Sequence, residues 1–143
     1  MDMRLAVLLA VASVARPVGA EEAPGFRVVV HRSNQVESLS RQQLADLFLK
    51  TVTRWPNGQT VQPVELRGEP EARVQFARQV HGKSLAALRS HWNKSIFSGR
   101  EVPPLELSSD EEVLAFVRAN PGAIGVVSAS ASTPGTRVVA VTD

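Results

Sequence analysis

The chain has 143 residues, of which 43% are hydrophobic and 21% are charged, so it is long enough to bury a core of its own. The formal net charge is only +2, and no cluster of Lys and Arg suggests a nucleic-acid-binding surface. Because cysteine is absent from the sequence, disulfides, a thiol nucleophile, cysteine-based zinc sites and a lipid-modified cysteine are all excluded.

The first twenty residues have the pattern of a cleavable secretory signal peptide. Arg4 gives a positive start, an apolar run covers residues 5–15, and Val18-Gly19-Ala20 offers small residues to a signal peptidase. The run is too short for a hydrocarbon core that takes about 20 apolar residues to cross. We therefore expect a signal peptide over 1–20, one domain over 21–143, periplasmic localisation and no stable membrane insertion. The alternatives are an uncleaved anchor and a misassigned start codon.

A buried strand followed by a helix is predicted next. Phe26–His31 is short and rich in valine, which is typical of a buried strand. Ser40 and Gln43 have the spacing of a capping box, so a helix should begin at Ser40. Leu39 and Leu44 stand where a hydrophobic staple would place them. The buried stripe of this helix is expected to contain Leu44, Leu47 and Phe48.

The middle of the chain should form a turn, a strand and two helices. Pro and Asn-Gly predict a turn over 55–59, and a strand is expected over 60–66. Pro70 suits a first helical turn and Gly82 suits the end of that helix. Its core-facing residues should be Phe76, Ala77 and Val80. Ser84 should cap the next helix, whose apolar residues at helical spacing are Leu85, Leu88, Trp92 and Ile96.

The last third of the chain should form one capped helix and two strands. Ser109 and Glu112 have the spacing of a second capping box, and Pro121-Gly122 should end that helix, with Gly122 as its C′ residue. The predicted buried stripe is Val113, Phe116 and Val117. Strands are expected over 123–128, with Gly125 allowing close packing, and over 137–141, with a loop between them. Alternating strands and helices predict a layered α/β sandwich with a mostly parallel sheet.

Several of these segments resemble phosphate-binding proteins of bacterial ABC importers, in the type II periplasmic-binding-protein superfamily. The segments that carry the resemblance are 44–50, 53–55, the strand that ends at Arg67, 109–117 and 120–127. Residues 38–130 resemble the second lobe of such a protein, and no segment resembles the first lobe. The resemblance implies a single lobe of the type II fold, a non-enzymatic and cofactor-free protein, and binding of an anion or another small solute.

The candidate anion site is the loop after the second strand. Ligands of open α/β sheets lie beyond the carboxyl ends of strands, where a following helix presents free amides. The family places an arginine there, which Arg67 matches, and then a Ser-Gly-Thr, for which this chain has Pro70-Glu71-Ala72 or Glu71-Ala72-Arg73. We therefore take Arg67, Glu71, Ala72 and Arg73 as the tentative anion-binding residues. Arg67 capping carbonyls or pairing with Glu69 or Glu71 is the structural alternative.

Other chemical signals are weak. His31, His81 and His91 are far apart and lack a carboxylate at metal-ligand spacing, so no metal site is predicted. Asp110, Glu111 and Glu112 suit the first turn of a helix, so no catalytic residue is predicted. Trp55 and Trp92 are expected to pack in the core.

The sequence leaves two functions open. The first is an exported solute-binding protein that takes phosphate or another small anion and works with an inner-membrane transporter. The second is a periplasmic interaction or accessory module that kept the lobe, lost the pocket and contacts an envelope protein or itself.

Overall fold

The computed structural model describes residues 24–143, so the predicted signal peptide and its cleavage after Ala20 lie outside the described residues. Within them, one sheet has the strand order β2-β6-β1-β5-β3-β4. The strands are β1 (Phe26–His31), β2 (Ser38–Ser40), β3 (Gln62–Leu66), β4 (Leu105–Leu107), β5 (Ala123–Ser128) and β6 (Thr136–Thr142). The helices are α1 (Arg41–Phe48), α2 (Glu71–Phe76), the π-helical turn η1 (Ala77–His81), α3 (Leu85–Phe97) and α4 (Asp110–Ala119).

The sheet is mostly parallel, as predicted, and β1 is the one reversed strand among the described residues. β1 runs antiparallel to both β5 and β6, whereas β2 pairs in parallel with β6, and β3 pairs in parallel with β4 and β5. The amino ends of the parallel strands therefore share one edge with the carboxyl end of β1. We call this the amino edge and the opposite one the carboxyl edge.

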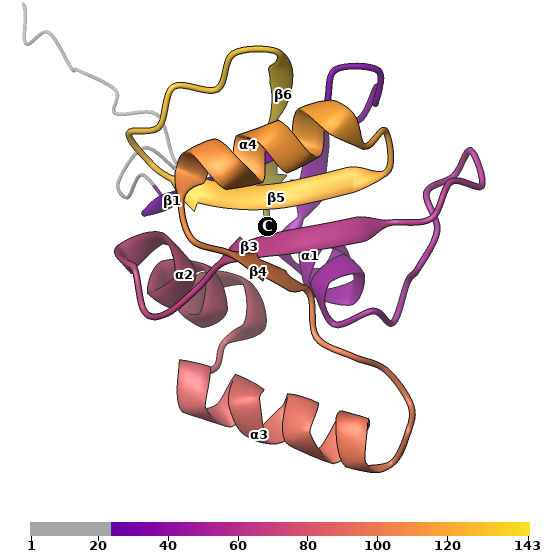
Figure 1. Ribbon diagram of the computed structural model, residues 1–143, viewed down its shortest axis with the longest axis vertical. Helices are drawn as coiled ribbons and strands as arrows, with labels where there is room; N and C mark the ends of the chain where they lie inside the picture. The colour runs from indigo at the N-terminus through magenta and orange to yellow at the C-terminus, as the bar shows by residue number, and fades with distance from the viewer. Residues whose placement is uncertain (1–23) are drawn as a thin grey trace, which may run out of the picture.

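Helices cover both faces of the sheet (Figure 1). α4 packs on one face, where Val113 and Val117 approach Gly125 so closely that a Cβ there would lie 2.7 Å from Val113 Cγ1. On the other face, the ring of Phe76 in α2 makes edge contacts with Phe26 and Phe48, at centroid distances of 5.2 and 4.8 Å. The close packing predicted at Gly125 is confirmed, and so is the layered α/β architecture.

Both helix starts predicted from capping boxes are confirmed, and one differs in detail. At Ser40 the capping box is complete: the hydroxyl accepts from the Gln43 amide, and the Gln43 side chain accepts from the Ser40 amide. At Ser109 the hydroxyl accepts from the Glu112 amide at 3.2 Å. The Glu112 carboxylate, however, accepts from the amide of Ser108 instead of closing the box on Ser109.

Three sequence-based expectations about packing are wrong. In α4, Leu114 is buried at 1% exposure, whereas Phe116 is only partly buried. In α3, Ile96 is half exposed and Trp92 is partly buried, whereas Leu85 and Leu88 are buried and cluster with Ala77 of η1. Gly122 does not have a left-handed backbone as a C′ residue would. It is small because a Cβ would lie 2.1 Å from the carbonyl oxygen of Thr60.

Candidate functional site

The carboxyl edge brings together the ends of β3 and β4 and the starts of α2 and α4 (Figure 1). Arg67 directly follows β3, and its amide donates to the Leu107 carbonyl at the end of β4, at 2.7 Å. Its guanidinium is exposed and donates to the hydroxyl of Ser108 at 3.4 Å, a long and weak bond. Arg67 therefore lies where the sequence predicted, at the end of a strand and beside two helix starts.

Arg73 is engaged by other protein groups. Its guanidinium pairs with the carboxylate of Glu106, lies 4.0 Å from that of Glu65, and donates to the Gly68 carbonyl at 3.2 Å. The Arg73 side chain is 15% exposed. Arg73 thus ties the loop after β3 to the sheet. Its guanidinium is occupied by these partners, whereas that of Arg67 is exposed.

The remaining two predicted residues lie in the first turn of α2. The α2 N-cap is Pro70, which makes no side-chain cap bond, and α2 begins at Glu71. The Glu71 carboxylate accepts from Gln75 at 2.8 Å, and Ala72 is 2% exposed. The predicted residues thus divide between an exposed Arg67, an acidic helix start and a paired Arg73.

Carboxylates already occupy amides at this edge. Asp110 accepts from the backbone N–H of Ser128 at 3.0 Å, and Glu112 accepts from the backbone N–H of Ser108 at 2.8 Å. α4 begins with three acidic residues in its first turn. These carboxylates already accept the backbone N–H groups of Ser108 and Ser128, and their negative charge already lies at the positive end of α4. An added anion therefore has to compete with them.

Beneath the edge, Glu65 and His81 are partly buried close to Arg73 and α3. Burial raises the pKa of Glu65 from 4.5 to about 7, an effect that the positive charge of Arg73 opposes and the carboxylate of Glu106 adds to. Burial lowers the pKa of His81 to about 4, with smaller contributions from Lys83 and His91. His81 Nδ1 is buried without a hydrogen-bond partner in residues 24–143. Both groups therefore favour their neutral forms.

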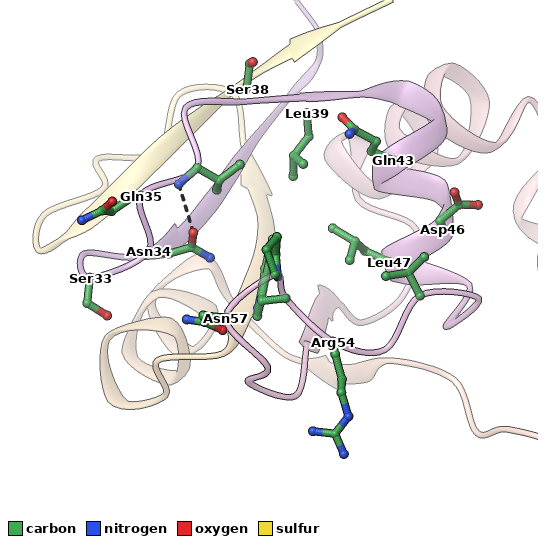
Figure 2. Close-up of a pocket in the computed structure, with 14 residues that line it drawn as sticks. Ser33, Asn34, Gln35, Ser38, Leu39, Gln43, Asp46, Leu47, Arg54 and Asn57 are labelled. Carbon is green, nitrogen blue, oxygen red and sulfur yellow. Dashed lines mark hydrogen bonds between the residues drawn. The ribbon is translucent and has the colours of Figure 1, made fainter.

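A cavity of about 820 Å³ lies at the amino edge, away from Arg67. It is an open groove between the segment that follows β1, helix α1 and the segment that precedes β3 (Figure 2). Sequence reasoning missed this groove, because its walls come from three loop and helix segments without a recognisable motif. A signal was present in the asparagine and glutamine residues of 34–57, which are frequent in that stretch.

Of the other predicted features, Trp55 does pack in the core at 7% exposure, and its indole N–H donates to the Gly122 carbonyl at 2.9 Å. In the described part of the chain, no group of three or more His, Asp and Glu side chains is placed to hold a metal ion. Nor does any helix of residues 24–143 have the length and apolar character that crossing a membrane requires.

Comparison with known proteins identifies the fold. No family model and no curated protein matches the chain. An ABC-type phosphate transport receptor from Vibrio cholerae has a similar structure, with a TM-score of 0.65, 19% identity, and coverage of 83% of this chain and 47% of the receptor. A protein from Clostridium perfringens, described as a putative phosphate ABC transporter substrate-binding protein and solved with bound phosphate, is also similar. Its TM-score is 0.61 at 21% identity, and the match covers 82% of this chain and 44% of that protein.

The chain therefore spans less than half the length of these solved proteins. The match covers most of this chain at low sequence identity, which is what a shared single lobe would give. The resemblance inferred from the sequence is confirmed at the level of the fold: the chain has the α/β fold of part of a phosphate ABC transporter substrate-binding protein.

Proposed function

We propose that the chain is an exported, non-enzymatic, solute-binding-like protein that takes a small oxyanion such as phosphate weakly at its carboxyl edge. The fold that it shares with substrate-binding proteins, one of them solved with phosphate, supports the solute-binding class. The observation that carries the location is the exposed guanidinium of Arg67 beyond β3, beside the starts of α2 and α4. A planar guanidinium suits the oxygens of phosphate.

Residues at the edge should divide the work. Arg67 would contact the anion, while amides in the first turn of α2, at Glu71 and Ala72, would supply further donors. Arg73 would hold the loop through the Gly68 carbonyl and its pair with Glu106. The carboxylates of Glu71, Asp110 and Glu112 should keep the affinity low, since each lies at a helix start that an anion would otherwise favour.

Titration calorimetry with phosphate tests this proposal. We expect phosphate to bind with a dissociation constant in the millimolar range, a binding free energy of about −4 kcal/mol. Arg67→Ala should abolish this binding, and the distant Arg100→Ala should leave it unchanged. Glu112→Gln should strengthen binding, because it removes a competing charge and can still accept from Ser108. Micromolar binding that survives Arg67→Ala would disprove the assigned site.

Export needs its own measurement. The native protein should be recovered from the periplasm with Glu21 as its first residue. Terminal sequencing that finds Met1 on the folded protein would refute the signal peptide, and with it the periplasmic location.

A second candidate, self-association as an interaction module, is favoured by one surface. Apolar side chains are exposed at the end of α3 and along the following segment to the edge strand β4: Ile96 at 50%, Phe97 at 96%, Val102 at 59% and Leu105 at 47%. Exposed apolar groups beside a free strand edge are typical of association sites. Sedimentation velocity should then show a dimer that Phe97→Ser dissociates, whereas a monomer at all concentrations would remove this candidate.

A further inference from the structure

The groove at the amino edge is lined by several asparagine and glutamine side chains (Figure 2). Four amide side chains line it, and in three of them the carbonyl oxygen accepts a backbone N–H. Asn34 accepts from Val36 at 3.0 Å, Gln43 accepts from Ser40 at 2.8 Å, and Asn57 accepts from Gln59 at 2.9 Å. These bonds fix which end of each amide is the oxygen, so the NH₂ ends are the ones left for other partners.

Those NH₂ groups are the donors that a ligand would meet. Within residues 24–143, the NH₂ groups of Asn34 and Gln43 make no hydrogen bond, and that of Asn57 makes one, to the Gln59 side chain at 3.1 Å. Each therefore has at least one N–H to offer. A matching ligand has to carry several acceptor oxygens along its length.

The rest of the lining mixes aliphatic and polar residues and carries no net charge. Its aliphatic members are Val36, Leu39, Leu47 and Val52. One acid and one base also line it, and each is already engaged: Asp46 accepts from Gln42 at 2.9 Å, and Arg54 donates to the Gly58 carbonyl at 2.9 Å. An oxyanion gains no net attraction from such a lining.

Trp55 narrows the choice of ligand further. Its indole is only 7% exposed and its N–H is used by the Gly122 carbonyl, so it offers no open ring face on which a sugar could stack. Backbone carbonyls of an extended peptide supply acceptors at regular intervals, and aliphatic side chains fit an aliphatic floor. A volume of about 820 Å³ is within the range of roughly 300–1,000 Å³ found for ligand pockets.

We propose that this groove binds an uncharged, extended peptide segment with aliphatic side chains. The amides of Asn34, Gln43 and Asn57 donate to its backbone carbonyls, and the aliphatic floor receives its side chains. This site is independent of the oxyanion site, because the groove lies at the amino edge and Arg67 at the carboxyl edge.

Nuclear magnetic resonance on the folded protein labelled with ¹⁵N provides the test, with the blocked peptide acetyl-Leu-Ala-Leu-amide as the probe. Side-chain NH₂ groups give their own signals, so the three donors can be followed directly. We expect titration to shift the NH₂ signals of Asn34, Gln43 and Asn57 together. No shift at about 10 mM peptide, which corresponds to binding weaker than about −3 kcal/mol, or shifts confined to other parts of the protein, would overturn the proposal.

Two variants separate binding from folding. Gln43→Glu keeps the oxygen that completes the capping box but removes the donor, so it should weaken peptide binding at least tenfold while leaving the melting temperature nearly unchanged. Asn93→Asp makes the same charge change on the exposed surface of α3, outside the groove lining, and should bind as the native protein does. Equal binding by native protein and Gln43→Glu would overturn the donor assignment.

The aliphatic floor is tested by Val52→Ser. Val52 is 42% exposed, so this change should not unfold the protein, yet it removes apolar contact inside the groove. We expect weaker peptide binding. Phosphate added in place of the peptide should leave the three NH₂ signals where they were, and a shift of those signals by phosphate would contradict an uncharged ligand.

Discussion

Single side chains set the stability of this protein where α4 meets the sheet. Val113 and Leu114 are almost completely buried there, whereas Phe116 keeps part of its ring in solvent. The size of a side chain is therefore a poor guide to its contribution in this helix. What counts is how much of it the sheet and the neighbouring strands enclose.

Alanine substitutions in α4 should show this order. Leu114→Ala should lower the free energy of unfolding by about 2–5 kcal/mol, because it opens a cavity in a buried site. Phe116→Ala should cost less, since solvent already reaches the ring and water can fill the space. Urea unfolding monitored by circular dichroism measures both. A larger loss for Phe116→Ala would mean that α4 is rotated about its axis.

The two partly buried groups Glu65 and His81 make opposite contributions to the pH dependence of stability. The folded pKa of Glu65 is raised, so its contribution is present below about pH 4.5 and is lost as the pH rises to about 7. The folded pKa of His81 is lowered, so its contribution is present above about pH 6.5 and is lost as the pH falls to about 4. Between these limits the two effects partly cancel.

Removing one of the two groups should leave only the contribution of the other to the change of unfolding free energy with pH. Relative to the native protein, Glu65→Gln should become progressively more stable as the pH rises from 4.5 to 7. His81→Asn should show the reverse, gaining on the native protein as the pH falls from 6.5 to 4. Denaturant melts at half-unit pH steps measure these differences. Two variants that follow the native curve in parallel would show that neither group titrates differently on folding.

At the scale of elements, the helices differ in how firmly the body of the protein holds them. α1 presents Leu44, Leu47 and Phe48 to the core and has a complete capping box. α3 touches a small second cluster only through Leu85 and Leu88, and its far end bears the fully exposed Phe97. Figure 1 shows α3 standing apart from the layers of the sheet and the other helices.

The same change at two caps should therefore have unequal effects. Ser40→Ala should cost about 1 kcal/mol of global stability, because the amide of Gln43 loses its acceptor at the start of a helix that the core needs. Ser84→Ala removes an equivalent bond to Ala87 but should mainly fray α3, with a smaller loss of global stability. Comparing the two midpoints in urea decides this, and equal losses would show that α3 unfolds together with the core.

Local patterns predicted most elements but missed the short ones. Capping residues and apolar spacing located the starts of the four described α-helices within a residue or two, because such signals are local. The single helix predicted between Pro70 and Gly82 is instead divided into α2 and the π-helical turn η1. β2 and β4 were missed, since each has three residues and exists only through its pairing with β6 or β3. Thr60 and Val61 were assigned to the strand that begins at Gln62, yet they pair with the segment 53–54 across the preceding turn.

The site was predictable only in part, for a related reason. Arg67 could be placed from strand polarity and the helix start that follows. The bonds of Arg73 to Glu65 and Glu106 join three segments, and no spacing in the sequence indicates them. The groove has the same origin, because distant segments build it.

At the scale of the whole molecule, α3 should be the first helix to open. Few apolar contacts and high exposure mean a small free energy of local opening. Hydrogen exchange followed by mass spectrometry should show peptides of residues 85–97 exchanging well before those of residues 110–119 and 123–128. Simultaneous exchange of the three segments would show that α3 is part of the cooperative core.

The reversed central strand governs the order in which the sheet can be completed. β1 is the first strand of the described chain, but its two neighbours, β5 and β6, are the last two. Until Ala123 and the residues after it are available, both edges of Val28–Val30 stay open, and these valines have no partner strands. Pairings so distant in sequence slow folding, since a long loop must close before they form. The native sheet can therefore form only late in folding, and β1 stays without a partner strand until then.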